Sequence, residues 1–427
     1  MAPRQAPEIR GFSSLSIPGI TVSEFVPGVI LHLLDNGAQP ANRISVYFSR
    51  GTSATDVRPA SALMPALMTE GTSTLSGAEI AEAVDFVGAF LRPLSSTHFS
   101  GLSVISPNDT TLSLVPLLAD MLTVPSFPAK AFEAARQKAA MSHRLDLSKP
   151  KFLAATALSS NLCGASHPYQ GPSSPEDIER VTVDEVRFAH SQARRTPVNI
   201  FAAGRLSEDI LKAIEELALR LQPSDVSQVA PVVPYVPDAR TDIRICSETA
   251  AEQAAVACGM PAVPRSHPDY DELRHTVVAL GGYFGSRLMT NIREEKGLTY
   301  GINAALMGSQ EGASVQISAQ CDNAYTDRVI DEIRNELHLL GETLMSEDEL
   351  RRVRADITSG LASRLDSPFS IIDYYETNLM VGIPDGYFTR QFETIRDLTP
   401  ERLRHLAATH LNPSSLTTVC ITAPDAR

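Results

Sequence analysis

The chain has 427 residues, of which 43% are hydrophobic and 20% are charged, and its mean hydropathy is −0.05. This composition supplies enough apolar material for two or three packed domains, so it excludes a disordered or fibrous protein. The 50 acidic and 37 basic residues give a net charge of −13, which repels phosphate backbones and anionic lipids. We therefore expect no nucleic-acid partner and no membrane partner.

Neither the cysteines nor the apolar stretches indicate a secreted or membrane-spanning protein. The five cysteines include no C-x-x-C pair, which predicts reduced and mostly buried thiols. The first residues do not lead into the apolar segment of a signal peptide, and no apolar run reaches the roughly 18 residues of a membrane span. We predict a cytoplasmic protein, although a periplasmic chain whose leader has been removed would have the same sequence.

The apolar periodicity predicts strands in two groups along the chain. In chain order they lie near 29–34, 44–49, 98–106 and 198–204, and then near 253–259, 299–307, 312–320 and 416–422. Ser76 to Glu79 and Ser346 to Glu349 have the spacing of capping boxes, so each pair predicts a helix start. Short strands separated by long helices predict the α+β class, with helices packed on a mixed sheet.

Two segments recur at almost the same distance along the chain. Residues 178–186 resemble residues 395–403, and each copy places a threonine, Thr182 or Thr399, at a predicted helix N-cap. The run after Asn108 resembles the run after Asn323. We infer a tandem duplication of a domain of about 215 residues. The predicted organisation is an N-terminal αβ domain at 1–222, a proline-rich linker at 223–239 and a homologous C-terminal αβ domain at 240–427.

Candidate chemistry is concentrated in one segment of the second half. The ten histidines contain no i, i+4 pair, so no helix presents two imidazoles to one metal ion, and we interpret all ten as solvated or capping residues. The run GGYFGSRLMTNIREEKGLTYGI, from Gly281, predicts a helix to about residue 296, a stop at Gly297 and then a strand. Arg293 and Tyr300 either converge on a peptide carbonyl or carboxylate, or merely pair with a glutamate and pack.

That segment resembles the C-terminal domain motif of the pitrilysin/insulinase family of inverted zinc peptidases, which includes mitochondrial processing peptidase. The shared features are the helix, the turn R-E-x-x-G-L-x-Y and the strand that follows. The likeness extends over the whole chain and implies two homologous αβ domains joined by a linker. It also implies that Arg293 and Tyr300 hold the backbone of a peptide substrate opposite a zinc site.

The zinc motif of the family is absent from this sequence. Members carry H-x-x-E-H on a helix of the first domain and a further glutamate ligand about 76 residues later. The corresponding positions here hold Ala62, Pro65, Ala66 and Ser142, and none of these side chains can replace an imidazole or a carboxylate on zinc. Pro65 lacks an N–H and is also expected to disturb the helix. We predict that this chain alone holds no metal and is inactive as a peptidase.

The resemblance implies a division of labour between two chains. In two-chain members the zinc and the Arg/Tyr pair can lie on different subunits. The first hypothesis is therefore a non-catalytic, substrate-binding or regulatory subunit that forms a peptidase chamber with a zinc-bearing homologue, as a heterodimer, or by self-association. The alternatives are a catalytically inactive scaffold and a stand-alone peptide-binding protein, in which an extended segment adds to a sheet edge.

Overall fold

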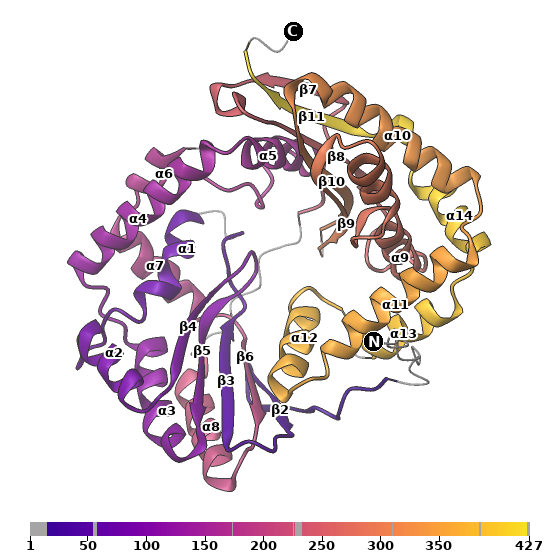
Figure 1. Cartoon of the computed structure of the whole chain (residues 1–427). Helices are drawn as coiled ribbons and strands as arrows, with labels where there is room; N and C mark the ends of the chain where they lie inside the picture. Colours follow the sequence, from indigo (N-terminus) through magenta and orange to yellow (C-terminus); the bar gives the residue numbers. More distant parts are fainter. Residues whose placement is uncertain are drawn as a thin grey trace, which may run out of the picture.

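The structure is a computed structural model that describes residues 15–53, 58–172, 174–224, 226, 233–309, 311–383 and 386–424. It consists of two sheets, each carrying helices, arranged as two halves of a curved molecule (Figure 1). The predicted α+β class is confirmed. Part of the predicted linker, at 225 and 227–232, lies outside the described residues, and residues 233–241 form neither helix nor strand.

The first half is built on a six-stranded mixed sheet in the order β1-β2-β6-β3-β5-β4. Its strands are β1 (Thr21–Val26), β2 (Val29–Asp35), β3 (Ala41–Phe48), β4 (Phe90–Ser95), β5 (Ser100–Pro107) and β6 (Val198–Gly204). Strands β2 and β6 run parallel, and the other pairs are antiparallel, with Val46 opposite Ile200 on β6 and Leu102 on β5. The sequence missed β1 and β4, because both are mostly exposed edge strands without an apolar face.

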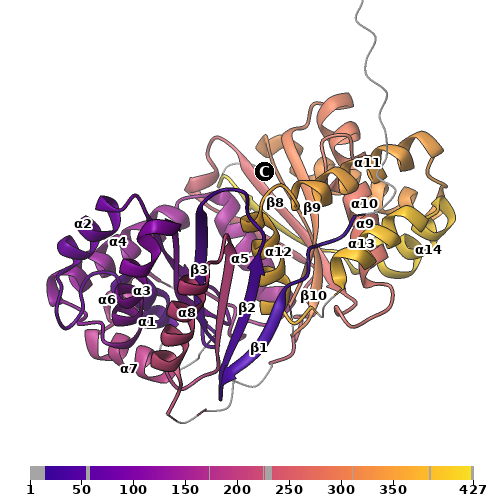
Figure 2. The same ribbon diagram turned by 90° about the horizontal axis from the view of Figure 1, so that it is seen from below.

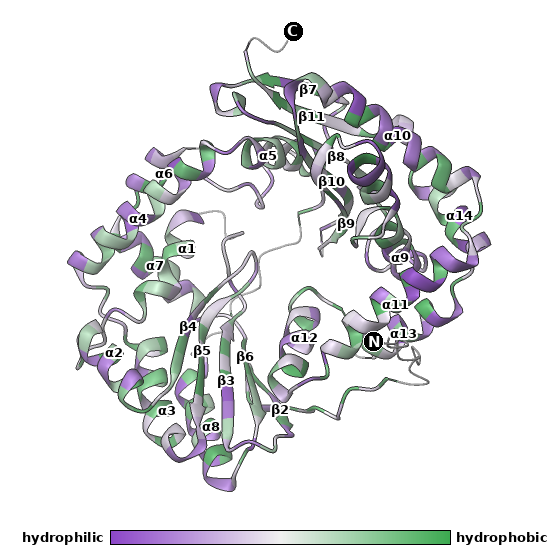
Figure 3. Ribbon diagram, viewed as in Figure 1, coloured by the Kyte–Doolittle hydropathy of each residue, from purple (hydrophilic) through white to green (hydrophobic). Residues whose placement is uncertain are grey.

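Helices cover one face of this sheet and enclose the first core. They are α1 (Arg58–Leu67), α2 (Gly77–Phe86), α3 (Asn108–Thr123), α4 (Ala129–Leu147), α6 (Pro175–Glu179), α7 (Val183–Ala193) and α8 (Glu208–Leu221). The predicted capping box of Ser76 and Glu79 is confirmed, and Thr182 forms a second one with Glu185. Figure 3 shows the hydrophobic residues gathered on the strands and on the helix faces turned toward them.

The second half repeats the path of the first. Its sheet has the order β7-β11-β8-β10-β9, with β7 and β11 parallel and the other pairs antiparallel. The same order and directions describe β2-β6-β3-β5-β4. The strands are β7 (Asp242–Cys246), β8 (Ala254–Ala262), β9 (Thr299–Gly308), β10 (Ala313–Cys321) and β11 (Thr417–Thr422).

The helices of the second half follow in the same sequence relative to the strands. They are α9 (Tyr270–Gly281), the π-helix η2 (Met289–Glu295), α10 (Thr326–Glu342), α11 (Glu347–Ser363), α13 (Tyr387–Asp397) and α14 (Pro400–His410). Short 3₁₀ turns are η1 (Glu248–Ala250), η3 (Asn323–Tyr325) and η4 (Pro413–Ser415). Ser346 caps α11 as predicted, but the carboxylate of Glu349 binds Arg287 and does not complete a capping box.

The halves exchange one helix each. Helix α5 (Pro150–Cys163) belongs to the first half by sequence but packs on the second sheet, where Leu158 and Leu162 contact the apolar face of β8 and β11. A Cβ atom at Gly259 would lie 2.9 Å from the carbonyl oxygen of Val315 and 2.9 Å from Leu162, so a larger residue here would displace the backbone of β10 or the helix. Helix α12 (Pro368–Met380) of the second half packs on the first sheet in the reciprocal way (Figure 2).

The contact of α12 with the first sheet contains a buried polar group. Arg43 on β3 donates from Nη2 to Glu376 on α12 at 2.5 Å, and it also pairs with Asp373. Tyr47 donates its hydroxyl to the same glutamate at 3.1 Å. Burial raises the pKa of Glu376 to about 7, against the effect of the Arg43 guanidinium. The free energy of this interface therefore depends on a carboxyl group that titrates near neutral pH.

Two further sequence expectations concern the cysteines and the histidines. All five cysteines are free thiols, and four of them are buried while Cys246 is exposed, as expected. The interpretation of all histidines as solvated or capping is wrong, because His32, His167, His190 and His275 are at most 8% exposed. His190, for example, bonds through Nε2 to the carbonyl of Leu122 at 2.9 Å, so a backbone acceptor satisfies the buried ring. No helix in the described ranges is long and apolar enough to cross a membrane.

Candidate functional site

The first component of the candidate site is the exposed face of α1. Ala62 and Ala66 lie one helical turn apart, and both are exposed. Ser142, the position of the expected third ligand, is exposed on α4, which packs against α1. Helix α1 therefore presents two methyl groups where a zinc peptidase presents two imidazoles.

The donor atoms at these positions do not fit a zinc ion. Zinc in a catalytic site takes three nitrogen, sulfur or oxygen ligands from the protein, whereas alanine and proline side chains offer none and a serine hydroxyl alone is a poor ligand. Across the part of the chain that is described, His, Cys, Asp and Glu side chains form no cluster of three or more able to hold a metal. No hydrolytic step can be derived through zinc on this chain.

Pro65 does not interrupt the helix as expected. Helix α1 continues through it to Leu67, and Met68 still donates to the carbonyl of Met64 at 3.0 Å. Proline removes only one hydrogen bond this close to the helix end, and its ring is buried in the first core. The glutamate of the family motif is therefore replaced without a change in helical path.

An apolar cavity lies beside Ala62, where the metal ligands would stand. Its volume is about 210 Å³. The walls come from α1, α4, the β4–β5 turn and the segment after α5, and they include Pro59, Ala62, Leu63, Ala139, Thr97 and Tyr169. The former metal position has thus become a largely hydrophobic space with Arg58 also at its wall.

The second component is the turn that carries Arg293 and Tyr300. Arg293 lies in the last turn of the π-helix, and π-helical turns are rare and occur often at functional sites. Lys296 donates to Asn291 at 3.1 Å, and Leu298 donates to Ile292 at 2.9 Å, so the chain is wider here than an α-helix. Gly297 ends it at φ +63°, as predicted. The sequence predicted a helix but not its π form, because hydrophobic spacing does not distinguish the two.

Arg293 and Tyr300 are both available at the surface of this turn. The Arg293 guanidinium carbon lies 4.8 Å from the centre of the Phe284 ring, which is a cation–π distance. Among the described residues no carboxylate lies within ion-pair distance of Arg293. Tyr300 is 86% exposed. The structural interpretation, in which Arg293 pairs with a glutamate and Tyr300 packs, is therefore not what the structure shows.

Phe284 is a member of this site that sequence reasoning missed. Its ring is 64% exposed, although a phenylalanine without a partner is normally buried. The signal was present in the glycine-flanked Tyr-Phe pair, in which Tyr283 is partly buried against the second core and Phe284 points outward. Arg293 and Phe284 form a cationic and aromatic pair, and Tyr300 is exposed on β9, the edge strand of the second sheet that begins just after them.

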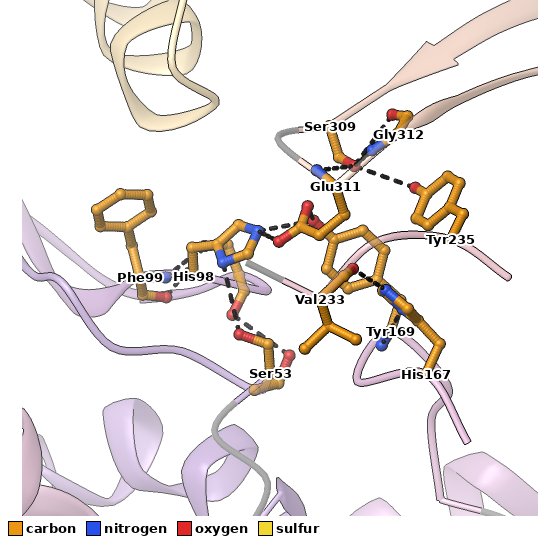
Figure 4. A network of polar contacts seen from close by, with 12 residues as sticks. Ser53, His98, Phe99, His167, Tyr169, Val233, Tyr235, Ser309, Glu311 and Gly312 are labelled. Carbon is orange, nitrogen blue, oxygen red and sulfur yellow. Dashed lines mark hydrogen bonds and ion pairs between the residues drawn. The ribbon is translucent and has the colours of Figure 1, made fainter. Parts of the chain in front are cut away.

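A third group of residues, which the sequence did not indicate, connects the two halves (Figure 4). His98, in the β4–β5 turn, contacts the Tyr169 hydroxyl at 2.7 Å and Glu311 Oε1 at 3.2 Å through Nε2. Tyr169 donates its hydroxyl to the other oxygen of Glu311, and burial raises the pKa of Tyr169. Glu311 lies at the turn between β9 and β10, so this contact bridges residues more than 140 positions apart.

Comparison with known proteins finds a family match for the segment that carries Arg293 and Tyr300. Residues 181–357 match the family model described as the peptidase M16 inactive domain. An uncharacterized zinc protease of Streptomyces coelicolor is 24% identical over 358 residues, which cover 80% of this chain and 76% of that protein.

Solved structures share the fold. The crystal structure of a peptidase M16 inactive domain from Pseudomonas fluorescens matches with a TM-score of 0.85 at 20% identity, and it covers 96% of this chain and 100% of that one. A chain of Complex III2 from Candida albicans matches with a TM-score of 0.73 at 15% identity, with 96% and 97% covered. The resemblance to the pitrilysin/insulinase (M16) peptidases inferred from the Arg/Tyr motif is confirmed, over residues 181–357 by the family model and over the whole chain by the shared fold.

Proposed function

We propose that this chain is the non-catalytic, substrate-binding subunit of an M16 zinc peptidase, and that it handles extended peptides in a chamber formed with a zinc-bearing homologue. The observation that carries the proposal is the contrast between the two halves. Arg293 has no carboxylate within ion-pair distance among the described residues and Tyr300 is 86% exposed, whereas α1 offers no metal ligand.

The chemistry of the pair suits a peptide backbone. A guanidinium donates parallel hydrogen bonds to a carbonyl or carboxylate, and a phenol adds one more donor. Each such bond is worth about 1.5–3 kcal/mol when it involves a charged group, which corresponds to about ten- to 150-fold in turnover. Arg293 is half-buried against the Phe284 ring and Tyr300 is exposed, so both can offer hydrogen-bond donors to a ligand that arrives at this turn.

Reconstitution with a zinc-bearing M16 homologue tests the proposal. Arg293→Ala and Tyr300→Phe should lower kcat/KM for a fluorogenic peptide at least tenfold, while the melting temperature stays within about 2 °C. Arg351→Ala and Tyr325→Phe are matched controls, because Arg351 is a surface arginine and Tyr325 is 43% exposed away from this turn. Full activity in both site variants would refute the proposal.

A scaffold role is the second candidate, and the likeness in fold to a chain of Complex III2 favours it. A scaffold binds its neighbours through its surface and has no use for free donors at Arg293 and Tyr300. It would assemble into a larger complex whether or not these residues are changed. Co-purification of a stable complex that tolerates both substitutions, with no peptide turnover, would favour this role.

A further inference from the structure

The bridge between the halves is a carboxylate held by two donors. The Glu311 side chain is 4% exposed; one of its oxygens accepts from the Tyr169 hydroxyl, and the other lies 3.2 Å from His98 Nε2, within ion-pair distance. Because the Tyr169 hydroxyl donates its proton to Glu311, its contact with His98 at 2.7 Å needs a proton on Nε2 of the imidazole, and Nδ1 accepts from the hydroxyl of Ser53 at 3.5 Å. The donors come from the first half and the carboxylate comes from the second.

The donor side is held by contacts with the first half and the linker that do not involve Glu311. The backbone N–H of Tyr169 donates to His167 Nδ1 at 3.2 Å, and the His167 ring in turn bonds through Nε2 to the carbonyl of Val233 at 2.8 Å. The His98 and Tyr169 rings also meet edge to face at 5.6 Å. This packing keeps both donors in place whether or not Glu311 is present.

Tyr169 borders two different environments. Its hydroxyl binds the carboxylate, and the same residue, with Thr97, lines the apolar cavity beside Ala62. That cavity, at about 210 Å³, holds several times the roughly 30 Å³ that one water occupies in the liquid. A carboxylate site and an apolar space are thus adjacent, which matches a single chemical unit, the carboxy-terminal residue of a peptide with an apolar side chain.

We propose that His98, Tyr169 and the cavity beside Ala62 form a binding site for the carboxy-terminal apolar residue of a peptide, and that Glu311 of the same chain occupies the carboxylate position when no peptide is bound. The ligand class rests on the proposed peptide-handling function. The space that a metal-dependent relative uses for zinc ligands serves here to bind a chain end. Glu311 acts as an internal competitor, because its hairpin presents it at a high effective concentration.

Peptide binding to the full chain tests the site without a partner subunit. The probe is a fluorescently labelled extended peptide that ends in leucine with a free carboxylate, followed by anisotropy. Glu311→Ala should bind it about tenfold or more tightly than the unaltered chain, because the competitor is gone. Glu311→Gln should lie between the two, and Glu342→Ala, at an exposed glutamate elsewhere, should change nothing. No gain in either Glu311 variant would overturn the proposal.

Further variants and peptides separate the two parts of the site. In the Glu311→Ala background, His98→Ala should remove the preference for the free carboxylate over the same peptide with a carboxy-terminal amide. Ala62→Phe, which fills the cavity from an exposed helix position, should weaken binding of both peptides tenfold or more. Equal binding of the carboxylate and the amide would overturn the carboxylate site. Equally tight binding of an amidated peptide with an internal glutamate would overturn the assignment to a chain end.

Failure of this inference is distinguishable from failure of the proposed function. Arg293→Ala in the same assay should weaken the carboxylate and amide peptides by the same factor, since it contacts the backbone. If Arg293→Ala weakens peptide binding and the Glu311, His98 and Ala62 variants have no effect, the proposed function is supported and the binding site for the carboxy-terminal residue is refuted.

Discussion

The buried carboxyl group of Glu376 should make the stability of the chain depend on pH in a way that one substitution removes. Its side chain is 5% exposed between α12 and the first sheet. Burial raises its pKa from an ordinary 4.5 to about 7. The perturbation is Glu376→Gln, which keeps the shape and still accepts from the Tyr47 hydroxyl but cannot titrate.

The direction of this pH dependence follows from the number of protons that the folded and unfolded chains bind. Between pH 4.5 and about 7 the folded chain holds a proton on Glu376 that the unfolded chain has released. Protonation of Glu376 therefore contributes fully to the free energy of unfolding below pH 4.5, and this contribution is lost as the pH rises through 7. At about 1.4 kcal/mol per pKa unit, the difference between 4.5 and about 7 corresponds to about 3 kcal/mol.

Urea unfolding from about pH 5 to about pH 8 measures this contribution. The unaltered chain should lose about 2.5 kcal/mol more than Glu376→Gln over this range, because a small part of the contribution is already lost at pH 5. Glu342→Gln, at an exposed position, serves as the control for a change of one charge. Identical pH dependence in the unaltered chain and Glu376→Gln would show that Arg43 keeps the carboxylate ionised, and it would refute the reasoning.

The other predictions concern single contacts and the metal. Phe284→Leu removes the aromatic ring that contacts Arg293, and this contact is worth about 0.5–1 kcal/mol, so the Kd for the peptide should rise two- to fivefold. Phe284→Tyr keeps a ring and should leave the Kd unchanged. Equal peptide affinity of the unaltered chain and both variants would contradict this prediction. Leu158→Ala leaves a cavity between α5 and the second sheet and should lower the free energy of unfolding by about 2–5 kcal/mol in urea, and a loss below about 1 kcal/mol would show loose packing. Metal analysis of the dialysed chain should find no stoichiometric zinc, and one tightly bound zinc per chain would contradict the ligand argument.

Much of the fold followed from local sequence patterns. Apolar strands such as β2, β3 and β10 are buried on at least one face, so their periodicity was visible. The helix starts at Ser76 and Thr182 depend only on side chains three residues apart. The absence of zinc ligands and the end of the helix at Gly297 could also be predicted from residues that are close together in the sequence.

The tertiary structure alone decided which distant residues meet. The exchange of α5 and α12 between the halves depends on which sheet face each helix reaches, and both helices have apolar residues that would suit either sheet. The contact of His98 and Tyr169 with Glu311 joins three separate turns. Turn residues carry no periodic pattern, and their partners are set by how the two halves pack, so no local rule predicts them. The sequence therefore determined the family motif and its missing metal ligands, while the packing of the halves decided which turn residues meet between them.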